Sequence, residues 1–199
     1  MNGPRMRALF CLVALGFALV IGGCSTSDRE SAATAPSAQA ELPAPVAART
    51  DEKSAPKSIA VGGDSAITEA VATDTTGALL PPQDVRRLGW WVDSSLPGSG
   101  KGTIVVTGHV NEADQGTGFA ARFATMKPGE TVAVTTASGQ QINYRVTRIQ
   151  NADKETGFPS DELNRVDGPE TLALVTCGGQ FVGPPLGYKD NVIAWATRA

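Results

Sequence analysis

The chain is poor in the residues that most often carry chemistry. Among its 199 residues there are one histidine and three cysteines, and aromatic residues make up 6%. A single histidine excludes a metal site built from several imidazoles. Lysine and arginine total 17 against 20 aspartate and glutamate, which gives a formal net charge of -3. Without an excess of positive charge, the chain is not typical of proteins that bind a nucleic-acid backbone.

The N-terminus has the organisation of an export signal. Arg5 and Arg7 form a positively charged start, and residues 8–23 are an uninterrupted run of apolar or small residues. This run is shorter than the roughly 20 residues that span a bilayer, so a cleaved lipoprotein-type signal peptide is expected over residues 1–23. It ends Ile21-Gly22-Gly23-Cys24, which resembles a bacterial lipobox, where the cysteine is acylated. The alternatives are an uncleaved anchor and an ordinary secretory signal.

A segment of low complexity follows the signal. Most residues from 25 to 56 are alanine, serine, threonine or proline, and none is aromatic. Such a composition buries too little apolar surface to offset the entropy of ordering, so residues 24–56 are predicted to form a disordered tether. With a lipid on Cys24, the tether would hold residues 57–199 in the cell envelope, on the extracytoplasmic side of the membrane.

Processing changes the meaning of the three cysteines. Cys11 leaves with the signal and Cys24 carries the lipid, so Cys177 remains without a disulfide partner. Exported domains normally pair their cysteines. Cys177 is therefore either an inert core residue or a reactive thiol.

Residues 57–199 have mostly β-strand patterns. Short runs rich in β-branched residues and bounded by turn residues predict strands. These runs are residues 58–61, 66–71, 77–80, 103–107, 131–135, 141–149, 171–176 and 191–196. Helical signals are limited to residues 117–126 and a turn at Ser160. Seven or eight short strands predict a closed or nearly closed β-barrel with one or two short helices.

The histidine and the remaining cysteine occupy equivalent places in this pattern. His109 follows the strand predicted at residues 103–107, and Cys177 follows the strand predicted at residues 171–176. A thiolate attacks a carbonyl only when a neighbouring base or positive charge supports it. Each residue alone is as well explained by a structural role, but together they indicate a thiol nucleophile with an imidazole partner.

Four motifs, in this order, resemble those of the sortase family, and of the actinobacterial class F sortases in particular. They are Gly89-Trp90-Trp91, Gly108-His109-Val110, Thr171-Leu-Ala-Leu-Val-Thr-Cys-Gly-Gly179 and Tyr188-Lys-Asp-Asn-Val192. Their order and spacing match the family across residues 57–199, essentially the whole predicted domain.

The resemblance implies an eight-stranded sortase β-barrel and a cysteine transpeptidase mechanism without a cofactor or metal. Cys177 would attack the threonine carbonyl of an LPxTG-like sorting signal on a secreted protein, giving a thioacyl enzyme. His109 would protonate the leaving amine and then deprotonate an amine of a peptidoglycan precursor or another envelope acceptor. Backbone N–H groups near Cys177 would hold the oxyanion, and residues 151–169 would form the variable loop beside the substrate groove.

One residue departs from the family pattern. Class F sortases usually read Tyr-Arg-Asp-Asn where this chain has Lys189 after Tyr188. Lysine keeps the charge but lacks the planar fork that donates to two carbonyls at once. Three interpretations follow: Lys189 substitutes as a catalytic residue at a reduced rate, Arg145 or Arg148 supplies the group, or the protein is a catalytically weak or silent sortase-fold lipoprotein that binds peptides in the envelope.

Other candidates have simpler explanations. Trp90 and Trp91 are expected to pack in the barrel rather than line a groove. Glu112 and Asp114 could suggest calcium, but two carboxylates in a loop are more often solvated. In papain-like peptidases the cysteine precedes the histidine, and this chain has the reverse order.

Overall fold

The computed structural model describes residues 42–199. The strands in this part of the chain are β1 (Val46–Ala47), β2 (Pro56–Val61), β3 (Asp64–Ala72), β4 (Leu88–Trp91), β5 (Thr103–Thr107), β6 (Asn111–Glu112), β7 (Gly116–Thr117), β8 (Thr131–Thr136), β9 (Gln141–Asp153), β10 (Thr171–Gly183) and β11 (Gly187–Arg198). Two short helices accompany them, the 3-10 helix η1 (Phe119–Thr125) and α1 (Ser160–Leu163). None of the helices in residues 42–199 is long and apolar enough to cross a membrane.

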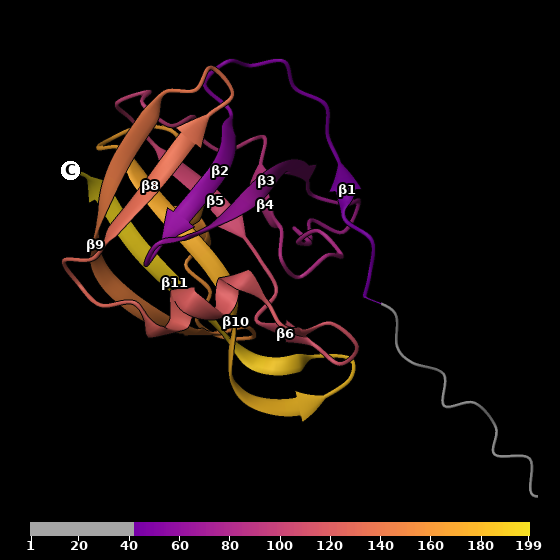
Figure 1. Ribbon diagram of the computed structural model, residues 1–199. Helices are drawn as coiled ribbons and strands as arrows, with labels where there is room; N and C mark the ends of the chain where they lie inside the picture. The colour runs from indigo at the N-terminus through magenta and orange to yellow at the C-terminus, as the bar shows by residue number, and fades with distance from the viewer. Residues whose placement is uncertain (1–41) are drawn as a thin grey trace, which may run out of the picture. The chain divides into compact units, whose positions relative to one another are not determined.

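The main sheet closes on itself. Its strand order is β1-β3-β2-β8-β9-β11-β10-β5-β4, and a further pairing of β3 with β4 joins the ends. The long strand β3 makes this possible, because residues 64–67 pair with β2 and residues 68–71 pair with β4. Eight of the strands therefore form a barrel, with β1 added to β3 (Figure 1). The predicted mainly β fold, an eight-stranded barrel with short helices, is confirmed.

Buried and exposed side chains alternate along the barrel strands, and the buried ones fill the interior of the barrel. In β8, Val132 and Val134 are fully buried, and in β9 Ile142, Tyr144 and Val146 point the same way. Their neighbours along each strand are more exposed, as expected for a strand with one face toward a core.

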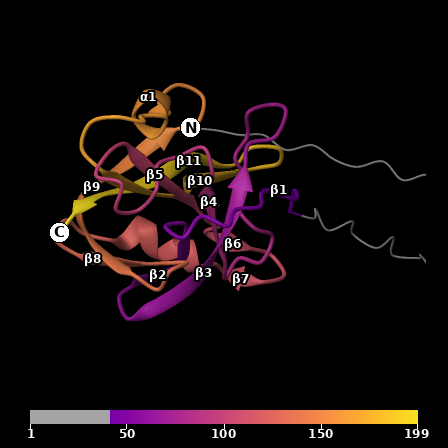
Figure 2. The same ribbon diagram turned by 90° about the horizontal axis from the view of Figure 1, so that it is seen from above.

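Strands β5 and β10 differ, because they are buried on both faces. Ile104 and Leu172 pack in the barrel core, whereas Val105 and Ala173 belong to a second cluster with Leu163 of α1. Figure 2 shows α1 outside the barrel, near β9 and β11. The two strands run parallel and adjacent, in a register that pairs Thr171 with Thr103. Both are therefore held from two sides.

Some expectations about elements differ from the structure. Residues 77–80 form a loop, and β4 was not expected as a strand. Residues 42–55, predicted as the end of the tether, include β1, in which Val46 pairs with Ala72. The signal peptide, Cys24 and the rest of the tether lie outside the described residues, and the domain boundaries stay predictions.

Candidate active site

His109 lies two residues beyond the end of β5, where Gly108 keeps the chain tied to β10. The Gly108 N–H donates to the carbonyl of Val175 at 3.1 Å, and Thr176 Oγ1 donates to the carbonyl of Gly108 at 2.8 Å. Gly108 also passes very close to its neighbours. A Cβ added there would lie 2.6 Å from side-chain atoms of both Ala120 and Leu88. The backbone before the histidine is thus fixed by hydrogen bonds and by contacts that only glycine allows.

Cys177 lies where β10 leaves the barrel. Residues 171–176 are buried, and Cys177 is half-buried and is a free thiol. The expectation that the strand ends at Thr176 is wrong, since β10 continues to Gly183 and pairs with β11 as a ribbon. Figure 1 shows this ribbon in yellow, extending from the barrel beside β6.

The parallel register brings together the strands that lead to the two residues. It pairs Val175 with Thr107. The hydrogen bonds of Gly108 with Val175 and Thr176 extend this contact one residue beyond β5, so the backbone segments that lead into His109 and Cys177 lie side by side. The sequence predicted equivalent positions for the two residues, and the strands that lead to them are adjacent and parallel.

The imidazole of His109 is half-buried and its Nε2 atom has no hydrogen-bond partner within the described residues. Burial lowers the pKa of His109 below its ordinary value of 6.5, and the nearby carboxylate of Glu112 opposes this shift. The ring is therefore mainly neutral at neutral pH. Its Nε2 atom is itself buried, so a group that exchanges a proton with it must approach within the site.

Lys189 lies at the edge of this site. Its Nζ is 3.4 Å from Oδ2 of Asp153, and its side chain is 54% exposed. The pKa of Asp153 is lowered, first by the backbone N–H groups of Glu155 and Thr156 and more weakly by Lys189. The ammonium is thus paired with a carboxylate while most of its surface stays open to solvent.

A second lysine, which the sequence interpretation missed, contacts the thiol. Lys154 Nζ lies 3.7 Å from Sγ of Cys177 and donates to the carbonyl of Leu186 at 3.2 Å. No local signal marks this residue, because it lies in a loop after β9. It reaches Cys177 only because β11 pairs with both β9 and β10.

Comparison with known proteins places this geometry in a family. The profile of the sortase domain matches residues 60–199. The chain belongs to the sortase family. A search of curated proteins finds no match.

Solved sortase structures share the fold. Sortase C-1 from Actinomyces oris is 22% identical with a TM-score of 0.55, over 71% of this chain and 72% of that one. A pilus-related sortase C of Group B Streptococcus is 19% identical with a TM-score of 0.56, over 75% and 69%. A lid mutant of sortase A from Corynebacterium diphtheriae is 24% identical with a TM-score of 0.52, over 74% and 72%. At these identities the likeness establishes the fold.

Arg145 and Arg148, which were considered as replacements for the arginine missing at position 189, make other contacts in this sortase. Arg148 donates to both carboxylate oxygens of Glu162 and lies 4.5 Å above the ring of Trp195. Arg145 donates to the carbonyl of Gly129. Trp195, beside Arg148, is four positions along β11 from Asn191, the partner of Cys177, so Arg148 lies well away from the thiol.

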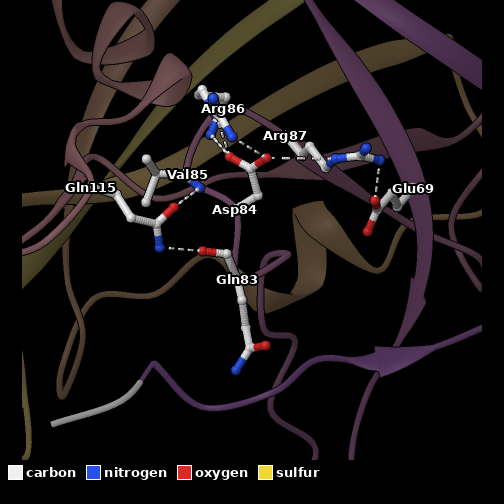
Figure 3. Close-up of polar contacts among 7 residues, drawn as sticks. All are labelled: Glu69, Gln83, Asp84, Val85, Arg86, Arg87 and Gln115. Atoms are coloured by element: carbon white, nitrogen blue, oxygen red, sulfur yellow. Dashed lines mark hydrogen bonds and ion pairs between the residues drawn. The ribbon is translucent and has the colours of Figure 1, made fainter.

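The segment after His109 is anchored by polar contacts. Gln115, in the turn between β6 and β7, accepts from the N–H of Val85 and donates to the carbonyl of Gln83 (Figure 3). In the same view Arg87 joins Asp84 to Glu69 of β3. The short hairpin that follows the histidine is therefore tied to the loop before β4.

The remaining candidates have structural roles. Trp90 packs in the barrel core and Trp91 against the second cluster. Glu112 accepts the backbone N–H groups of Asp114 and Gln115, which stabilises the hairpin turn. Within residues 42–199 there is no group of three or more side chains able to hold a metal ion.

Proposed function

We propose that this sortase is a cysteine transpeptidase in which Cys177 is the nucleophile and His109 the general acid and base. The observation that carries the proposal is the pair of hydrogen bonds between Gly108 and residues 175 and 176. They keep the two chain segments adjacent, and these segments lead directly into the only imidazole of the chain and the only free thiol of the described residues, which supports pairing them.

The first half-reaction forms a thioester. The neutral His109 ring takes the proton of the Cys177 thiol, the resulting thiolate bonds to the threonine carbonyl carbon of an LPxTG-like signal, and the electron pair of the carbonyl moves onto oxygen. Backbone N–H groups near Cys177 stabilise this oxyanion. When it collapses, the threonine–glycine C–N bond breaks and the leaving nitrogen takes the proton of the His109 imidazolium.

The second half-reaction restores the enzyme. An acceptor amine attacks the thioester carbon and gives a proton to the neutral His109 ring, while the C–S bond breaks and Cys177 leaves as a thiolate that takes this proton back from the imidazolium. Burial favours the neutral ring, which is the form that this step needs. The acceptor is an amine of a peptidoglycan precursor or of another envelope component.

Lys189 is assigned to the substrate side of the site. Its exposed ammonium can donate to a substrate carbonyl, in the place where class F sortases usually carry arginine. The motifs around Gly89, His109, Cys177 and Tyr188 support assignment to class F. A lipid on Cys24 would hold the enzyme at the outer face of the membrane, where secreted substrates pass.

Mass spectrometry tests the proposal on the full chain in detergent. With an LPxTG-type peptide and an amine acceptor, we expect a thioacyl adduct on Cys177 and then an amide product. Cys177→Ala should form neither. If no adduct appears across several sorting motifs while the peptides still bind, the protein is instead a peptide-binding envelope lipoprotein with a silent site, an interpretation favoured by the lysine at position 189.

A further inference from the structure

The turn after β9 presents Lys154 to Cys177. Its Nζ lies 3.7 Å from Sγ, within reach of a charge-assisted hydrogen bond to sulfur, and 3.2 Å from the carbonyl oxygen of Leu186. Lys154 is half-buried, so its charge is less screened by water than that of an exposed lysine. Leu186 lies in the turn between β10 and β11. One ammonium therefore links the nucleophile to the end of the ribbon that carries it.

The turn itself is tightly built. Asp153 Oδ1 accepts the N–H groups of Glu155 and Thr156 and the hydroxyl of Thr156, and the N–H of Gly157 donates to the Asp153 carbonyl. The backbone N–H of Lys154 donates to the carbonyl of Lys189 at 3.2 Å. The side chain of Lys154 thus starts from a backbone fixed at both the turn and β11, which favours the orientation toward the thiol.

A thiolate at Cys177 needs a positive charge that the mainly neutral imidazole of His109 does not supply. Burial lowers the pKa of His109, so at neutral pH few molecules carry the imidazolium that would otherwise neutralise the sulfur. Lys189 is paired with Asp153 and more than half exposed. Lys154 is the lysine for which a contact with Sγ is found within residues 42–199.

We propose that Lys154 is the cation that stabilises the Cys177 thiolate, and that Lys189 is left to bind substrate. Two lysines from different segments would then divide tasks for which the family pattern offers one arginine. The inference rests on the proposed role of Cys177 as the nucleophile. Because a point charge suffices to hold a thiolate, whereas a bidentate grip on carbonyls needs a planar fork, lysine suits the first task well.

Thiol alkylation tests Lys154 without any sorting signal. The full chain in detergent is treated with iodoacetamide, an uncharged reagent, and modification of the Cys177 peptide is followed by mass spectrometry so that Cys11 and Cys24 do not interfere. We expect Lys154→Met to slow alkylation at pH 7 by about 10-fold. Lys101→Met is the matched control, because Lys101 is exposed and pairs with Pro169, just before the end of β10 that lies opposite Cys177, and it should change the rate less than about 2-fold. Lys154→Arg should restore most of the rate.

A measurement at high pH separates charge from access. Near pH 9.5, where an ordinary thiol is largely ionised, the difference between wild type and Lys154→Met should shrink. A difference that persists there would show altered access and overturn the proposal, as would equal effects of the two methionine variants or no effect at pH 7.

The alkylation result does not depend on whether the protein catalyses transpeptidation. Slower alkylation in Lys154→Met with no acyl-enzyme in any variant would refute the transpeptidase and keep Lys154 as the thiolate partner. Normal alkylation and normal acylation in Lys154→Met would refute the role of Lys154 and keep the transpeptidase.

Discussion

Thr176 Oγ1 donates a 2.8 Å hydrogen bond to the carbonyl oxygen of Gly108, and both residues are buried. The bond joins positions that are 68 residues apart in the chain. Each of the two residues directly precedes a proposed catalytic residue, Cys177 or His109. The contact therefore sets the spacing of nucleophile and imidazole from the backbone, independently of any contact between their side chains.

Replacing Thr176 by valine should test this coupling. The change keeps the shape of the side chain but removes the donor to the Gly108 carbonyl, which costs about 1–3 kcal/mol of unfolding free energy. We also expect acyl-enzyme formation to slow by about 10-fold, because small misplacement of reacting groups is costly. Urea unfolding measures the loss of stability, and quenched-flow acylation measures the rate of acyl-enzyme formation.

The control is Thr136→Val. Thr136 is also fully buried, and its hydroxyl bonds to Ser138 and Gln140 at the end of β8. It should lose similar stability but keep the acylation rate. Equal losses of rate in the two variants would show that Thr176 acts only through general stability.

Much of this arrangement could be predicted from the sequence, because it depends on local patterns. The runs before His109 and Cys177 are β-branched and short, and they form β5 and the buried half of β10. The sequence could not show that the two strands are adjacent and parallel, since pairing between distant segments leaves no periodic signal in either. That adjacency brings together the backbone segments that lead into His109 and Cys177.

The missed features share a dependence on long-range pairing. Residues 178–183 contain three glycines and no regular alternation, and they are a strand because β11 pairs with them. The same applies to β4, which is only four residues long. Lys154 looks like an ordinary loop residue until the order β9-β11-β10 brings its turn to the thiol.

Glu170 should be a determinant of stability rather than of catalysis. It is 6% exposed, accepts from the Tyr144 hydroxyl at 2.6 Å, and also accepts the N–H groups of Gly98 and Gly100. Glu170→Gln places an amide donor against one of these donors, and we expect a loss of about 1–3 kcal/mol in urea unfolding. Glu162→Gln, which removes an exposed charge from the pair with Arg148, should cost less than about 1 kcal/mol. A larger loss for Glu162 than for Glu170 would contradict this assignment.

Arginine at position 189 should improve the enzyme. Its planar fork adds a second donor toward a substrate carbonyl, and one more hydrogen bond corresponds to roughly a 2- to 10-fold gain in rate. The measurement is kcat/KM for Lys189→Arg with an LPxTG-type peptide, beside Lys189→Met, which should lower it. A loss in the arginine variant would mean that the site is built around lysine and its pair with Asp153.

His109 should make the stability of the domain fall as the pH falls below about 7.5. In the unfolded chain the histidine titrates near its ordinary pKa of 6.5, whereas burial lowers the pKa in the folded protein. Between these values the unfolded state binds more protons, so acidification favours unfolding, by no more than about 1.4 kcal/mol per pH unit for one group. The loss should level off once the folded protein is also protonated.

Because the chain has a single histidine, this pH dependence of stability can be assigned to His109. Urea unfolding from pH 7.5 to 5.5 should show the slope in the wild type and a flatter profile in His109→Gln. Asp84 and Asp153 do not mimic it, because both carboxyl pKa values are lowered below 3.8 and their contributions are lost only at more acidic pH. If stability instead rises on acidification, the field of Glu112 outweighs burial and the histidine is mainly protonated. The imidazolium would then share the task of neutralising the thiolate.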